Sequence, residues 1–151
     1  HFASPRTGRS HSRLDGCCTE LSTRFDFISR REHPMSTFEH KALIQNISQS
    51  MATLRKAQPD AMQGFGQLAK AAMAEGTVSA KHKELIALAI GITQHCSGCV
   101  GFHVKALRRL GCSREELEEM LAICVYMGGG PALMYASEAV AAWDAFASDT
   151  P

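Results

Sequence analysis

The feature that most restricts the fold of this chain is an apolar run, Leu85 to Ile92, that follows a short cluster of charged residues. Its hydrophobic residues occupy nearly every side of a helix, and such a helix is stable only when other elements cover most of its surface. Ser79 is placed to cap the start of this helix. The whole chain has only 151 residues, so we expect a partner subunit to supply part of that burial.

Apolar residues recur at helical spacing on both sides of this run. Capping boxes are expected at Ser36 with Glu39 and at Ser113 with Glu116. The stretch from Gly128 to Pro131 lacks the features of a phosphate-binding loop, so we interpret it as a helix break. The predicted helices are 36–58, 60–76, one that starts at 79, 96–110, 113–128 and 131–146. No segment has the pattern of a strand, and the chain is predicted to be an all-α bundle of about six helices.

Charge and hydrophobicity exclude several classes of protein. The formal net charge is +1 and 45% of the residues are hydrophobic, which is ordinary for a soluble domain and offers no basic surface for nucleic acid. The longest apolar runs are far shorter than the roughly 20 residues that cross a bilayer, so no membrane is expected. The six cysteines lie mostly within or beside predicted helices. We therefore expect a reducing compartment, the cytoplasm.

Residues 1–34 differ in composition from the rest of the chain. They contain six arginines, no lysine and four acidic residues, with little periodicity. They lack the apolar block of a secretory signal, and a transit peptide would carry fewer acids. Met35 opens the first clear helical pattern. We expect 1–34 to be a disordered extension or sequence upstream of the natural start, and 35–151 to be the helical domain.

Two cysteines and a histidine follow the apolar run at spacings of three and four, as Cys96, Cys99 and His103. On a helix that begins near His95, these spacings place both sulfurs and the imidazole on one face. The backbone N–H groups and dipole at a helix start favour the thiolate of Cys96. The Cys-x-x-Cys spacing permits a reversible disulfide, and His103 can accept or return a proton.

Glu84 opens the apolar helix and offers a carboxylate for activating a thiol. Its contact with the cysteines requires the intervening chain to fold back. We favour a redox site made of Glu84, Cys96, Cys99 and His103, without metal or cofactor. Two alternatives stay open. One is a zinc site in which His95 or Glu84 is the fourth ligand, and the other is a pair of cysteines that serve only as small core residues.

Three motifs of this chain resemble the carboxymuconolactone decarboxylase and alkylhydroperoxidase D-like superfamily: KHKELIALAIGI, CSGCVGFH and YMGGGPALMYASEA. The similarity extends over roughly residues 59–146. It implies an all-α fold that assembles as a homotrimer or homohexamer. It also implies that Glu84, Cys96, Cys99 and His103 match the glutamate, the Cys-x-x-Cys pair and the histidine of the redox branch.

The resemblance implies a thiol-dependent peroxide reductase whose Cys96–Cys99 disulfide is reduced by an external dithiol. Glu84 and His103 would relay a proton from Cys99, whose thiolate attacks the peroxide, and Cys96 would resolve the sulfenic acid. The helix-start argument favours Cys96 as the attacking sulfur, so that assignment stays open. Alkylhydroperoxidase D has a further histidine where this chain has Gly98, which leaves the reductant open. A cofactor-free decarboxylase and a redox sensor without turnover are the alternative functions.

Overall fold

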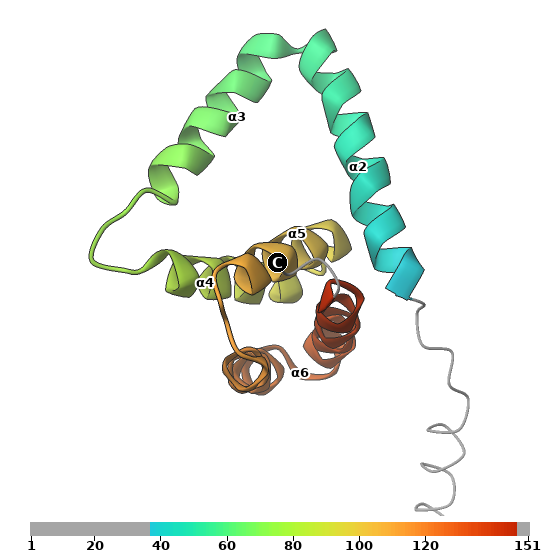
Figure 1. The fold of residues 1–151 in the computed structure, drawn as a ribbon, viewed down its shortest axis with the longest axis vertical. Helices are drawn as coiled ribbons and strands as arrows, with labels where there is room; N and C mark the ends of the chain where they lie inside the picture. The colour runs from blue at the N-terminus through green and yellow to red at the C-terminus, as the bar shows by residue number, and fades with distance from the viewer. Residues whose placement is uncertain (1–36, 148–151) are drawn as a thin grey trace, which may run out of the picture. The chain divides into compact units, whose positions relative to one another are not determined.

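The computed structural model describes residues 37–147, and within that range it contains helices and no strand. The helices, labelled as in Figure 1, are α2 (Thr37–Ala57), α3 (Pro59–Ala72), α4 (Ala80–Thr93), α5 (Ser97–Arg109) and α6 (Arg114–Ala145). The predicted all-α fold is confirmed. The segment 1–34, Cys17, Cys18 and Ser36 of the first expected capping box lie outside the described residues.

The apolar helix α4 is buried on one side only, since Ile86 and Ile90 are 55% and 56% exposed in the single chain. It packs on α5 and α6, which also pack on each other, and α2 packs on α5 and α6 (Figure 1). Leu88 and Ile92 of α4 have no exposed surface. The other large apolar side chains that are almost fully buried come from α5 and α6: Val100, Val104, Leu107, Leu117 and Phe146. This core holds α4 and α5 in a fixed relative position.

The bounds of α3 differ from the prediction at both ends. Pro59 is its first residue, where proline costs nothing because that N–H has no helical partner. The helix ends at Ala72 and not at Gly76. The Nζ of Lys83 donates hydrogen bonds to the carbonyls of Ala72 (3.1 Å) and Ala74 (2.5 Å). These bonds satisfy one carbonyl at the end of α3 and one just after it, neither of which has a partner within the helix.

The two predicted C-terminal helices share the label α6, and they are joined at a kink where the backbone is not helical. Gly129 has φ 63° and ψ −150° inside it, and Pro131 follows two residues later. A residue with a side chain would be strained at this backbone conformation. The predicted capping box of Ser113 and Glu116 is present at its start. The helix break predicted at 128–131 is therefore confirmed, and the five labelled elements of the described residues correspond to the six predicted helices.

By length and composition α6 is apolar enough to cross a membrane, and it is the single described helix that meets this criterion. It also supplies nine buried residues, among them Leu117, Leu121 and Trp143. The core helix of a water-soluble protein has the same properties, so the criterion is weak for α6.

Glycines allow α2 to lie directly on α5. A Cβ atom at Gly101 would lie 2.5 Å from Cγ2 of Ile44, and one at Gly98 would lie 2.8 Å from Cδ1 of Ile47. Both distances are shorter than carbon atoms tolerate, so a larger residue at Gly98 would displace the end of the Ile47 side chain, and one at Gly101 would press on the branched Cγ2 of Ile44. The helix that carries the two cysteines is therefore fixed by α2 on one side and by α4 on another.

Gly101→Ala is expected to destabilise the protein by about 1–3 kcal/mol, because Ile44 is buried and its branched Cγ2 cannot move aside. The matched control is Gly66→Ala in α3, where no atom lies within 4 Å of the added Cβ. That change is expected to stabilise the protein by up to about 1 kcal/mol. Urea unfolding of both variants measures the difference, and equal shifts would contradict the close approach of α2 and α5.

Candidate functional site

The predicted carboxylate and imidazole are in contact. Glu84 Oε2 of α4 lies 2.6 Å from His103 Nδ1 of α5. The side chains of Glu84 and His103 are 16% and 30% exposed, so the pair is partly shielded from water. The contact forms because α5 runs back along α4 after a short turn. A carboxylate at Nδ1 fixes the orientation of the ring and leaves Nε2 as its proton-exchanging nitrogen.

The two predicted cysteines form a disulfide at the start of α5. Cys96 and Cys99 are joined through their sulfurs, with their Cα atoms 5.2 Å apart. The helix α5 begins at Ser97, one residue later than predicted, so Cys96 is its N-cap. The Sγ of Cys96 accepts a hydrogen bond from the backbone N–H of Cys99 at 3.2 Å. Both residues are partly exposed. The Cys96 sulfur thus occupies the end of the helix that favours negative charge.

Cys99 lies on the α4 side of its helix, as His103 does. A Cβ atom at Gly91 of α4 would lie 3.0 Å from Cβ of Cys99, which shows how closely the two helices approach there. Four residues along a helix correspond to about 6 Å, so the imidazole is one turn beyond this sulfur. Glu84 and the first two turns of α5 therefore bring a thiol pair, an imidazole and a carboxylate into one region. Between residues 37 and 147 no three His, Cys, Asp or Glu side chains are grouped to hold a metal ion.

The turn that presents Cys96 contains a strained residue. His95 has φ 56° and is the one described residue other than glycine with positive φ. The N–H groups of His95 and Cys96 bond to the carbonyls of Ile92 (3.1 Å) and Gly91 (2.9 Å). This hydrogen-bond pattern is a Schellman motif, in which glycine is the usual residue at the left-handed position. The left-handed conformation of His95 is unfavourable for a residue with a side chain. It turns the chain after α4 and so determines where Cys96 and the start of α5 lie.

Sequence analysis missed Tyr135, whose ring stacks on His95 with centroids 4.9 Å apart and planes at 21°. Tyr135 follows the kink of α6, and a Cβ atom at Gly128 just before that kink would lie 3.7 Å from a methyl group of Thr93. The kinked segment thus lies next to the end of α4. No spacing rule links residues 40 positions apart, and the glycine-rich stretch was the only signal for this contact.

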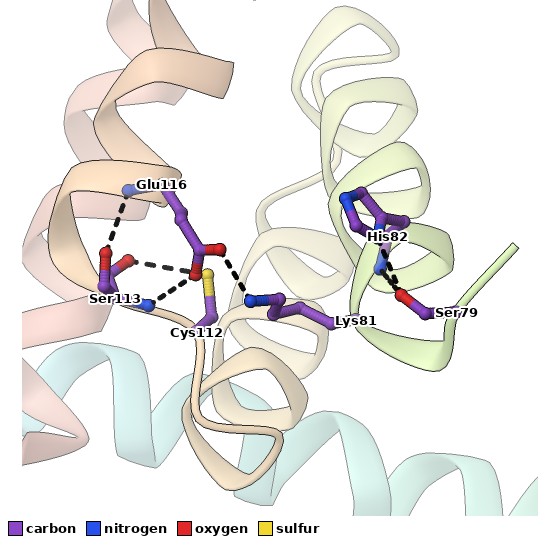
Figure 2. A network of polar contacts seen from close by, with 6 residues as sticks. All are labelled: Ser79, Lys81, His82, Cys112, Ser113 and Glu116. Atoms are coloured by element: carbon purple, nitrogen blue, oxygen red, sulfur yellow. Dashed lines mark hydrogen bonds and ion pairs between the residues drawn. The ribbon is translucent and has the colours of Figure 1, made fainter.

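The start of α4 is joined to the start of α6 by a polar network (Figure 2). The Nζ of Lys81 donates to Glu116 Oε1 at 2.6 Å, and Glu116 Oε2 accepts from the backbone N–H of Ser113 at 2.9 Å. These hydrogen bonds lower the pKa of Glu116, with Lys81 as the largest cause. Lys81 precedes Glu84 by three residues, so the network helps to fix the turn of α4 that holds the carboxylate.

Cys112 lies in the same network, and it is almost buried. Burial, and then the negative charge of Glu116, raise the pKa of the Cys112 thiol from 9.0 to about 11. The folded chain therefore holds this proton more tightly than the unfolded chain does. The stability that depends on the protonated thiol is fully present below pH 9.0 and decreases as the pH rises towards about 11. Cys112 is thus an inert thiol at neutral pH.

Alkylation rates test this assignment. In the reduced native protein at pH 8, iodoacetamide is expected to label Cys112 about 100-fold more slowly than in urea, because a pKa raised by two units lowers its thiolate fraction by that factor. The partly exposed Cys96 and Cys99 serve as internal references and are expected to react first. Peptide mapping by mass spectrometry separates the sites. If Cys112 in the native protein is labelled as fast as Cys99, the burial of Cys112 and its raised pKa would be contradicted.

Comparisons with known proteins found a matching family model and several similar proteins. The family model described as "Carboxymuconolactone decarboxylase family" matches residues 59–143. An uncharacterised protein of Cupriavidus necator is 43% identical over 109 residues, which are 72% of this chain and 96% of that protein. "Uncharacterized protein 4 in cox locus" of Paracoccus denitrificans is 34% identical over 80 residues, which are 53% of this chain and 72% of that protein.

A solved structure is also similar to this chain. It is the apo form of a carboxymuconolactone decarboxylase family protein from Legionella pneumophila, with a TM-score of 0.70 and 45% sequence identity. The alignment covers 72% of this chain and 96% of that one. The residues matched by the family model include the disulfide and the Glu84–His103 pair.

Proposed function

Because the chain belongs to the carboxymuconolactone decarboxylase family, we propose that it is a thiol-dependent hydroperoxide reductase. The observation that carries the proposal is a partly exposed Cys96–Cys99 disulfide on the same helix as an imidazole whose ring is held by Glu84. A dithiol that closes across two intervening residues can pass between its oxidised and reduced forms without a change of fold. The proposed catalytic residues are therefore Glu84, Cys96, Cys99 and His103.

The proposed reaction begins with the reduced pair. His103, held by Glu84, accepts the proton of the Cys99 thiol, and the thiolate attacks one oxygen of the peroxide. The O–O bond breaks, Cys99 becomes a sulfenic acid, and the other oxygen leaves as an alcohol or water after taking the proton back from His103. The Cys96 thiol then attacks the Cys99 sulfur. Water leaves, and the disulfide forms.

An external dithiol returns the pair to its reduced form. It attacks the Cys99 sulfur, the Cys96 sulfur leaves as a thiolate, and the second thiol of the reductant then releases Cys99. The hydrogen bond from the Cys99 N–H supports Cys96 in this role, since it stabilises negative charge on the leaving sulfur. The cycle consumes one peroxide and one dithiol and requires no metal or cofactor. We propose the cytoplasm as its location, because reducing thiols are abundant there.

We also propose that the protein works as a homo-oligomer. The described residues leave several large apolar side chains at least half exposed on α4 and α6. They are Ile86, Ile90, Ile123, Tyr126, Met127 and Met134. Patches of this kind on a small domain are typical of surfaces that another subunit covers. A homotrimer or a homohexamer would bury them.

Met127→Lys is expected to shift the assembly towards monomer, because Met127 is 73% exposed in the single chain and a charge there would be buried in the oligomer. Ser50→Asp, an exposed position of α2, is the control and is expected to leave the assembly unchanged. Sedimentation velocity measures both. A wild-type chain that sediments as a monomer at high concentration would contradict the proposed assembly.

The function is tested with the full chain, an organic hydroperoxide and excess dithiothreitol. Peroxide consumption that continues over many turnovers and requires both Cys96 and Cys99 supports the proposal. Decarboxylation of a lactone substrate that survives loss of both thiols would instead identify the decarboxylase alternative. Oxidation that changes oligomeric state or partner binding, with no turnover, would identify a redox sensor.

A further inference from the structure

The turn between α4 and α5 contains a residue whose conformation the backbone alone does not explain. The turn consists of residues 94–96, between Thr93 and Ser97. His95 at its centre is left-handed, with φ 56°. Glycine adopts this conformation without a steric penalty, whereas a residue with a side chain is destabilised there. The hydrogen bonds of the turn come from the backbone N–H groups of His95 and Cys96, so they do not require a histidine. The role of this side chain therefore depends on a contact made by its ring.

The ring of Tyr135 makes that contact. The two rings stack with their centroids 4.9 Å apart and their planes at 21°. Tyr135 lies on a fixed part of α6, because Ala132 and Ala136 beside it are buried in the core. His95, by contrast, is exposed and lies in a turn. The stack therefore joins the turn to the packed body of the protein at the residue that precedes Cys96.

The two redox states of the thiol pair place different demands on this turn. In the oxidised chain the disulfide itself holds Cys96 at the start of α5, next to Cys99. Reduction removes this covalent restraint, and the unfavourable conformation of His95 then favours relaxation of the turn. A relaxed turn lets the Cys96 sulfur move away from Cys99, which lowers the effective concentration of one thiol at the other. The stack of His95 on Tyr135 opposes this relaxation, because it does not depend on the disulfide.

We infer that Tyr135 is a positioning residue for the thiol pair. By stacking on His95, it holds the reduced turn in the geometry from which the disulfide closes. A preorganised dithiol loses less conformational freedom when it closes, so its disulfide is harder to reduce. The same restraint keeps Cys96 within reach of a sulfenic acid on Cys99. The inference rests on the proposed function only for this last consequence, because the equilibrium between dithiol and disulfide exists whether or not the protein reduces peroxides.

Glycine at position 95 would not have the same effect as a stacked histidine. It would adopt the left-handed conformation at no cost, but in the reduced chain it would also adopt many others. A stacked aromatic pair shifts an equilibrium by about three- to tenfold. That factor is of the same order as the penalty for a left-handed residue with a side chain. The stack is therefore strong enough to keep the reduced turn ordered.

The test is to equilibrate the full chain with mixtures of reduced and oxidised glutathione. Two glutathione thiols are oxidised to one glutathione disulfide for each Cys96–Cys99 disulfide that is reduced. Acid quenching, alkylation and mass spectrometry give the oxidised fraction of the pair. Tyr135→Ala is expected to shift the equilibrium about three- to tenfold towards the dithiol. Tyr135→Phe keeps the ring and is expected to match the wild type. No shift in Tyr135→Ala, or an equal shift in Tyr135→Phe, would overturn the inference.

Variants of His95 show whether Tyr135 acts through this residue. His95→Ala lies at an exposed position where the fold does not depend on the side chain. It removes the ring and keeps the backbone penalty, so it is expected to shift the equilibrium towards the dithiol even if Tyr135→Ala does not fold. In His95→Gly no ring is left to stack, and adding Tyr135→Ala is expected to cause no further shift. A further shift of three- to tenfold would show that Tyr135 acts by another route and would overturn the inference.

The inference and the proposed function fail separately. If the equilibrium with glutathione responds as expected and the chain consumes no peroxide, the proposed function is wrong and the positioning role is supported. If peroxide turnover is observed and the equilibrium is the same with and without the stack, the positioning role is wrong.

Discussion

Replacing Cys99 with serine is expected to reduce dithiol-dependent peroxide turnover to the uncatalysed rate, a loss of at least about 10³-fold. A serine hydroxyl at this position cannot act as a thiolate and cannot close the disulfide with Cys96. Cys96→Ser is expected to lose turnover as well, because the sulfenic acid on Cys99 then has no neighbouring thiol to resolve it. Initial rates of hydroperoxide consumption with excess dithiothreitol measure both variants.

The remaining described cysteines provide matched controls. Cys112 and Cys124 are buried and have raised pKa values, in both cases chiefly because of burial. Cys112→Ala and Cys124→Ala are therefore expected to keep the wild-type rate. Trapping of the intermediate assigns the attacking sulfur: after peroxide treatment, Cys96→Ser is expected to carry a sulfenic acid on Cys99. A sulfenic acid that persists on Cys96 in Cys99→Ser, with none on Cys99 in the other variant, would reverse the two roles.

Glu84→Gln is expected to lower the turnover rate by about 10²-fold or more, the usual size of an acid–base contribution. Glutamine has nearly the same shape, but it lacks the negative charge of the Glu84 carboxylate. That charge stabilises the protonated form of His103, whose Nδ1 lies 2.6 Å from Glu84 Oε2. Glu119→Gln, an exposed glutamate of α6, is the matched control and should leave the rate unchanged. Steady-state kinetics under saturating dithiol isolate the peroxide half-reaction.

The contact between Glu84 and His103 predicts that their losses are not additive. If the two side chains act as one proton-transferring unit, Glu84→Gln combined with His103→Gln should be about as slow as the slower single variant. Multiplied losses in the double variant would show that each residue acts alone. Full activity of Glu84→Gln would exclude the carboxylate from the mechanism.

The sequence was sufficient to predict the fold class and most of the elements. The nearly all-apolar run of α4 and the capping box at Ser113 and Glu116 are local signals, and local signals fix where a helix forms. The predicted bounds of α3 were wrong at both ends. Pro59 was treated as the residue that ends the preceding helix, whereas it is the first residue of α3. The helix ends at Ala72, before Gly76, and the Ala72 carbonyl accepts a hydrogen bond from the Nζ of Lys83, a residue distant in sequence. The helix break predicted at 128–131 is confirmed, because the backbone of Gly129 is not helical.

The candidate site was predicted as a set of residues and not as a geometry. Cys96, Cys99 and His103 share one helix, so their spacing alone placed them together. Their contact with Glu84 depends on how α5 folds back along α4, which no local pattern specifies. The stack of Tyr135 on His95 arises from segments far apart in the chain. Such features are products of packing, and they became visible only in the folded chain.

The most direct test is to follow the thiols of the reduced full chain through repeated additions of hydroperoxide and dithiothreitol. Intact mass and peptide mapping are measured after each step. The proposed function predicts a loss of two hydrogens located at Cys96 and Cys99 after every peroxide addition, and full recovery after every dithiol addition. Thiols that stay reduced in excess peroxide, or a disulfide that forms once and is not recycled, would contradict it.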